Sequence, residues 1–71
     1  ASKEEIPLSW ATGRIAGEFI NLYPPGIPIL VPGERIEEIH CRRLEEYARE
    51  GLNVQGIIGE DEYRITVVRE Y

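Results

Sequence analysis

The sequence predicts a small α+β fold: a single domain with one main amphipathic helix, at about residues 35–50, packed on a few short strands. Three observations lead to this prediction. The chain has 71 residues, which is enough for one domain. Apolar residues recur at helical spacing most clearly over 35–50. Short apolar runs separated by glycine and proline fill much of the rest, a pattern typical of strands joined by tight turns.

The predicted helix has an apolar face and a charged face. At 100° per residue, the apolar face carries Ile36, His40, Cys41, Leu44, Tyr47 and Ala48, with Ile39 at its margin. On the charged face, Glu38 pairs with Arg42 and Glu45 with Arg49 at i,i+4 spacing, each pair worth about 0.2–0.5 kcal/mol. Glu34, Glu37 and Glu38 lie near the positive end of the helix dipole, and Gly51 is placed to end the helix.

Strands and connections account for the other ranges. Residues 1–12 are interpreted as a linker that enters one short helical turn, which Pro7 can open. Residues 14–22 are interpreted as a strand with a kink or bulge at Gly17, with a short helix as the alternative. Residues 54–58, apolar around Gly56, and the alternating residues 63–67 are predicted as two strands joined by a turn.

The Pro/Gly-rich segment 23–34 contains four prolines and two glycines. Pro25-Gly26 suits the centre of a type II turn, and the Tyr23–Pro24 bond is compatible with a cis peptide. Pro28 and Pro32 lack an amide donor, so neither is expected in a central strand. The apolar residues between the prolines predict an extended, rigid and mostly buried segment.

Composition excludes some classes of partner. The net charge is −5, so the chain lacks the basic face that nucleic acid requires. The single cysteine, Cys41, and the absence of a long apolar run or signal peptide predict a cytoplasmic protein with no membrane partner. A chain of this size buries only about 60% of its unfolded surface, so we expect it to dock on a larger body.

Three runs in fixed order carry a resemblance to a known family. They are Gly13-Arg14-Ile15-Ala16-Gly17-Glu18, then Tyr23-Pro24-Pro25-Gly26-Ile27-Pro28-Ile29-Leu30, then Pro32-Gly33-Glu34. Together they resemble the start of the C-terminal domain of fold-type I, pyridoxal-phosphate-dependent Orn/Lys/Arg decarboxylases. On this resemblance, residues 13–71 are assigned to that domain. The signature and interface candidates are Tyr23, Pro24, Pro25, Gly26, Pro28, Pro32, Gly33 and Glu34.

The resemblance implies a parent enzyme that is a carbon–carbon lyase of polyamine metabolism. Such an enzyme uses pyridoxal phosphate to remove the α-carboxylate of ornithine, lysine or arginine as CO2. The family's cofactor residues match no position here, and Lys3 is the only lysine. We therefore assign no catalytic, cofactor-binding or metal-binding residue to this chain, and expect it to be inactive alone. The resemblance also implies packing on the large catalytic domain, near the dimer interface and active-site entrance of a homo-oligomer.

Alternatives stay open at this point. The chain could be a free-standing binding or regulatory module of the same fold. Glu34 could touch a cationic substrate or an interface arginine, or could simply favour the helix N-terminus through the dipole. One histidine and one cysteine cannot complete a tetrahedral zinc site, so His40 is expected to be a half-buried, hydrogen-bonded side chain rather than a ligand.

Overall fold

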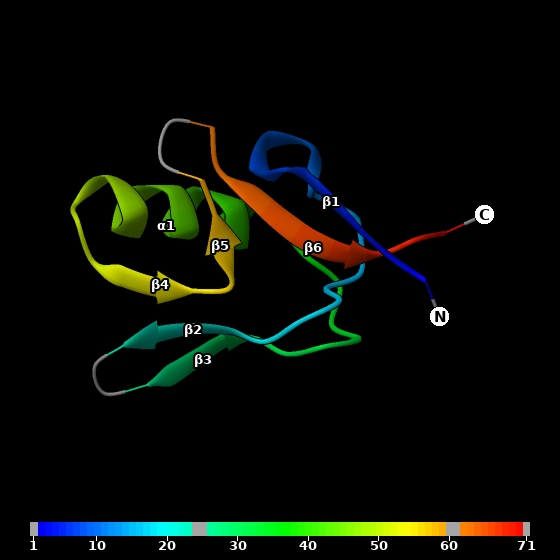
Figure 1. Cartoon of the computed structure of the whole chain (residues 1–71), viewed down its shortest axis with the longest axis horizontal. Helices are drawn as coiled ribbons and strands as arrows, with labels where there is room; N and C mark the ends of the chain where they lie inside the picture. Colours follow the sequence, from blue (N-terminus) through cyan, green and yellow to red (C-terminus); the bar gives the residue numbers. More distant parts are fainter. Residues whose placement is uncertain (1, 24–25, 60–61, 71) are drawn as a thin grey trace.

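The computed structural model describes residues 2–23, 26–59 and 62–70. Within these ranges the chain forms two three-stranded antiparallel sheets and one α-helix, which confirms the predicted α+β class (Figure 1). The N- and C-terminal strands lie together at one end, and the helix covers the other end.

The first sheet has the order β1-β6-β5, formed by β1 (Lys3–Pro7), β6 (Arg64–Val68) and β5 (Ile57–Ile58). The central strand β6 alternates as predicted, because Ile65 and Val67 are fully buried while their neighbours are only half-buried. Ile6 of β1 lies opposite Ile65. Alternation places both residues on the face that packs against the core.

The prediction of a linker over residues 1–12 is wrong for residues 3–7, which form β1. The short helical turn expected after it is present as a 3-10 turn, η1 (Leu8–Trp10). The polar start of the chain is stable as a strand because Ile6 is buried and because its glutamates face arginines far away in sequence. Arg14 contacts Glu4 at 2.7 Å, and the Arg64 guanidinium donates to the backbone oxygen of Glu5 at 3.0 Å.

The second sheet has the order β3-β2-β4, formed by β3 (Ile27–Leu30), β2 (Ile20–Tyr23) and β4 (Asn53–Gln55). The strand predicted over 14–22 is therefore split. Ile15 and Ala16 form isolated bridges to Arg35 and Val67, and the regular strand begins only at Ile20. Because β3 is an edge strand, Pro28 is tolerated in it, as its missing amide predicted.

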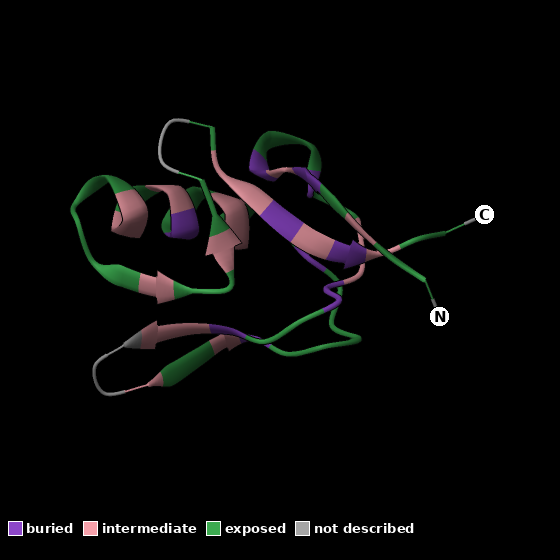
Figure 2. Ribbon diagram, viewed as in Figure 1, coloured by how far each residue is buried: buried purple, intermediate pink, exposed green. Residues whose placement is uncertain are grey.

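The prediction that segment 23–34 is mostly buried is wrong. Leu30 is fully buried, but Ile27 is 52% exposed and Pro28 is exposed beside it, as are residues 31–34 (Figure 2). The reason is that β3 lies at the edge of its sheet, where the described part of the chain leaves its outer side to solvent. Pro24 and Pro25 lie outside the described residues, so the turn at Pro25-Gly26 and the cis bond at Tyr23–Pro24 stay predictions. Gly26 is described and has the positive φ, 88°, that the predicted turn requires of it.

The helix α1 (Glu38–Arg49) confirms the predicted helix but begins three residues later. Residues 35 and 36 are held outside it, because the amide of Ile36 donates to the Arg14 oxygen at 2.8 Å. At its C-terminus Gly51 has φ 81° and donates to the Ala48 oxygen at 3.1 Å, which confirms the predicted end. Both predicted i,i+4 ion pairs are present, at 2.7 Å for Arg42–Glu38 and 3.1 Å for Arg49–Glu45.

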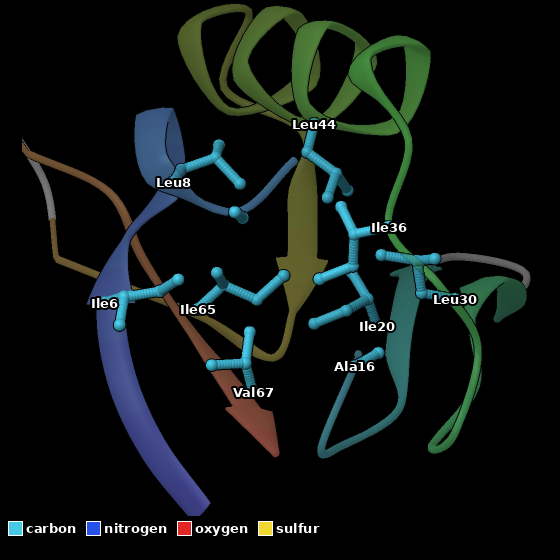
Figure 3. Close-up of a cluster of buried hydrophobic side chains, with 10 residues drawn as sticks. Ile6, Leu8, Ala16, Ile20, Leu30, Ile36, Leu44, Ile65 and Val67 are labelled. Atoms are coloured by element: carbon cyan, nitrogen blue, oxygen red, sulfur yellow. The ribbon is translucent and has the colours of Figure 1, made fainter. Parts of the chain in front are cut away.

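One core joins the helix and both sheets. Leu44 of α1 points between the sheets toward Ile65 and Val67 on one side and Ile20 and Leu30 on the other (Figure 3). The buried hydrophobic residues are Ile6, Leu8, Ala11, Ala16, Ile20, Leu30, Ile36, Leu44, Ile65 and Val67. A core this small leaves large apolar side chains uncovered, among them Trp10 at 72% and Phe19 at 58% exposure.

Gly56 is the point at which the chain passes from β4 in one sheet to β5 in the other. Its φ of 101° is a conformation that side chains disfavour, and a Cβ there would lie 2.5 Å from the carbonyl oxygen of Phe19. The apolar run 54–58, predicted as one strand, is therefore two short strands with a required glycine between them.

We predict that Gly56→Ala lowers the free energy of unfolding by about 3 kcal/mol, from backbone strain plus overpacking against β2. Gly51→Ala is the matched control, because Gly51 also has a positive φ but no described atom lies within 4 Å of the position that its added Cβ would take. The free energy of unfolding of the control should fall by about 1 kcal/mol, from backbone strain alone. Urea unfolding followed by circular dichroism measures both losses, and equal losses would contradict the close approach at Gly56.

Candidate functional site

The signature segment 13–17 lies alongside β6. The amide of Gly17 donates to the Thr66 oxygen at 3.0 Å, and the amide of Val68 donates to the Ile15 oxygen at 2.8 Å. The backbones approach closely, since a Cβ on Gly17 would lie 3.1 Å from the carbonyl carbon of Val67. A small residue at position 17 therefore lets the segment pair with residues 66–68 of β6, beyond the part of this central strand that pairs with β5.

The other side of the same segment pairs with residues 33–36. Ala16 donates to the Glu34 oxygen and accepts from the Gly33 amide, both at 2.8 Å. Ile36 donates to Arg14, and Gly13 donates to Ile36, also at 2.8 Å. Two runs of the signature that are separate in sequence are thus hydrogen-bonded to each other. This pairing was not foreseen from the sequence, in which no periodic pattern marks so short a bridge.

A tight turn at Val31–Glu34 presents the Pro32-Gly33-Glu34 run. The Glu34 amide donates to the Val31 oxygen at 3.1 Å, and Gly33 at the third position has φ 91°. Proline followed by glycine with a positive φ is the arrangement of a type II turn. In addition, Glu34 Oε1 accepts from the Val31 amide at 3.2 Å. Pro32, Gly33 and Glu34 therefore determine the backbone conformation of this turn.

These contacts bear on the two interpretations of Glu34. Because α1 begins at Glu38, Glu34 lies outside the first helical turn, and the interpretation based on the helix dipole is wrong. Its carboxylate instead closes the turn at Val31 and is exposed. A contact with a cationic substrate or an interface arginine stays a prediction.

Arg14, from the first signature run, joins the two ends of the chain. Its guanidinium donates to Glu4 at 2.7 Å and to the Val68 backbone oxygen at 3.4 Å, and its Nε lies 3.9 Å from Glu70. The side chains of Arg14 and Glu4 are 28% and 31% exposed, so the pair is largely screened from water. This arginine adds a side-chain bridge between β1 and β6, which are already paired through their backbones.

A groove runs between the β2–β3 hairpin and α1. It has a volume of about 470 Å³ and brings one signature candidate, Pro28, next to the helix. Two of its lining residues, Ile27 and Ile39, are 52% and 43% exposed. The lining residues are Leu22, Ile27, Pro28, Ile29, Ile39, His40, Arg43 and Tyr47. The candidates Pro32, Gly33 and Glu34 do not line it and lie in the 31–34 turn instead.

His40 is half-buried and hydrogen-bonded, as the sequence predicted. Its Nδ1 accepts from the Glu37 amide at 3.0 Å and so satisfies a free donor at the start of α1. A nitrogen that accepts a hydrogen bond carries no proton, so the neutral ring holds its proton on Nε2. Sequence reasoning missed this cap because histidine is not among the residues usually expected in that position.

No metal-binding cluster is found in the ranges that the structure describes, where no three His, Cys, Asp or Glu side chains come together. The Cys41 sulfur lies 3.6 Å from the Thr12 hydroxyl. No helix of the described chain is long and apolar enough to cross a membrane.

The chain belongs to the Orn/Lys/Arg decarboxylase C-terminal domain family, whose model matches residues 1–69. It is 42% identical over all of its length to an arginine decarboxylase of Halalkalibacterium halodurans, and 44% identical over 99% of its length to one of Bacillus subtilis. It spans 14% of each of these relatives.

Solved structures show the same fold. The constitutive lysine decarboxylase of Escherichia coli matches 94% of this chain with a TM-score of 0.78 at 26% identity. Lysine decarboxylase A from Pseudomonas aeruginosa matches 94% of the chain with a TM-score of 0.72 at 29% identity. This chain covers 11% of each of those proteins.

We predict that Gly33→Ala lowers the free energy of unfolding by about 1 kcal/mol, because alanine disfavours the positive φ of the 31–34 turn. Gly33→Asn should lose less, since asparagine tolerates this conformation and no described atom lies within 4 Å of the added Cβ. Urea unfolding compares the two variants. An equal loss of unfolding free energy in both variants would show that the added side chain, rather than the positive φ, causes the destabilisation.

Proposed function

We propose that this chain is the accessory C-terminal domain of a pyridoxal-phosphate-dependent decarboxylase of a basic amino acid, and that it docks on the large catalytic domain. The observation that carries the proposal is the match of residues 1–69 to the model of this domain family, in a chain that spans 14% of the arginine decarboxylases it resembles. The proposal includes cytoplasmic assembly as a homo-oligomer, with this domain near the dimer interface and the active-site entrance.

The chemistry belongs to the catalytic domain in this proposal. Pyridoxal phosphate acts as an electron sink and is held by a lysine. The only lysine here, Lys3, pairs with Glu18 on the surface, where both side chains are about half exposed. Such an exposed setting does not suit a cofactor that must be held away from water. This domain binds no cofactor in the proposal and acts by packing on the catalytic domain. The exposed apolar residues of its hairpin and helix provide the surface for docking.

Arginine is the first substrate to test. The relatives named arginine decarboxylases from H. halodurans and B. subtilis match essentially the whole chain. A lysine decarboxylase of P. aeruginosa matches 65% of it, at 49% identity. The similarity therefore extends furthest toward the proteins named for arginine.

The test uses the full-length protein encoded by the gene. We expect its reading frame to continue for several hundred residues upstream of Ala1 and to contain a Ser-x-His-Lys type of cofactor lysine. With pyridoxal phosphate, the purified protein should release CO2 from arginine, lysine or ornithine. Replacement of the cofactor lysine should abolish the release, and this chain alone should release none.

Two results would contradict this proposal. A stop codon immediately before Ala1 would favour the alternative of a free-standing binding or regulatory module. CO2 release by the chain alone, lost in His40→Ala, would show that the chain has its own catalytic site.

A further inference from the structure

The groove between the β2–β3 hairpin and α1 is lined by apolar side chains on the hairpin side and by several polar side chains on the helix side. Leu22, Ile27, Pro28 and Ile29 line it from the hairpin. The helix contributes Ile39, which is 43% exposed, together with three residues that have polar ends: His40, Arg43 and Tyr47. Such a mixture of apolar contact area and a few placed polar groups is typical of a recognition surface.

Arg43 gives this groove its charge. The chain carries a net charge of −5, yet Arg43 is the one described lining residue with a full formal charge, and it is positive. Among the described residues it forms no ion pair, whereas its neighbour Arg42 contacts Glu38 at 2.7 Å and Arg49 contacts Glu45 at 3.1 Å. Arg42 and Arg49 are thus paired with glutamates of the same helix, whereas the guanidinium of Arg43 is available to an acidic group of another segment.

His40 adds a directed donor to the same groove. Its Nδ1 is occupied by the Glu37 amide at 3.0 Å, so the neutral ring can donate only through Nε2. A carboxylate accepts hydrogen bonds and has none to donate, so it suits a guanidinium and an Nε2–H together. The chemistry that fits is therefore an acidic side chain flanked by apolar ones.

We propose that this groove receives a segment of the catalytic domain that places apolar side chains on Ile27 and Ile39 and a carboxylate against Arg43 and His40. This inference rests on the proposed function, which supplies the catalytic domain. A second copy of this domain is a poorer occupant, because a two-fold contact between two such grooves brings Arg43 of each copy toward the other. The groove thereby fixes how the domain is oriented on the enzyme.

Cross-linking in the full-length holoenzyme identifies the occupant. A benzophenone amino acid in place of Ile39 should, after irradiation, form a cross-link to a catalytic-domain peptide that contains an Asp or Glu among apolar residues. The same photo-reactive residue in place of Arg42, which faces the Glu38 side of the helix, is the matched control and should give little or no product. A cross-link from position 39 to another copy of this domain, or no more product than from position 42, overturns the inference.

Charge reversal provides an independent test that does not depend on a bulky probe. In the holoenzyme, Arg43→Glu should raise the rate of deuterium exchange in the hairpin and the first half of α1 about tenfold relative to Arg42→Glu. Changing the cross-linked acidic residue to lysine should restore slow exchange in the Arg43→Glu protein. Equal exchange in the two arginine variants, or no restoration, contradicts the charge pairing.

These outcomes are separate from those that test the proposed function. A full-length protein that releases CO2 but shows no groove cross-link removes the docking inference alone. A reading frame without a catalytic domain removes the proposed function first.

Discussion

The fold depends on a five-residue strip of backbone, residues 13–17, that is hydrogen-bonded on both sides. On one side it pairs with β6 through Gly17 and Ile15, and on the other with residues 33–36 through Ala16 and Arg14. Without this strip, residues 33–36 would share a core with the first sheet but little backbone bonding. Small side chains are required at its last two positions, since Ala16 is fully buried and Gly17 lies against Val67. A domain with so few buried residues depends heavily on such a bridge, because its core alone is marginal.

The strip also determines the shape of the surface that we propose for docking. It holds residues 33–36, which connect the edge strand β3 to the start of α1, and so it helps to position the hairpin relative to the helix. The groove between them contains Pro28, whose missing amide weakens β3 as a template for further strands. Recognition at this place therefore relies on side chains, with apolar contact from the hairpin and charge from the helix. A preformed groove costs less entropy on binding than a flexible one.

Much of the fold was predictable from local patterns. The helix, its two i,i+4 ion pairs, the glycine at its end and the alternation of β6 all follow from spacing that a sequence shows directly. Strand β1 was missed because Glu4 and Glu5 looked like a solvated linker, and their arginine partners lie at least ten residues away.

The exposure of segment 23–34 was missed because its apolar residues suggested a core. Ile27, in the edge strand β3, is instead 52% exposed. The groove and the pairing of the signature runs were not predictable, since they join residues on separate elements whose relative positions come from tertiary packing.

Amide hydrogen exchange at Ala16 and Gly17 tests the central role of the strip most directly. Both amides donate to backbone oxygens, Ala16 to Glu34 at 2.8 Å and Gly17 to Thr66 at 3.0 Å. If the strip ties the first sheet to residues 33–36, these amides open only when the whole domain unfolds, and their exchange should be as slow as that of the central strand β6. Exchange at Ala16 and Gly17 that is much faster than in β6, with β6 still protected, would show that the first sheet stays folded without the strip and would contradict its central role.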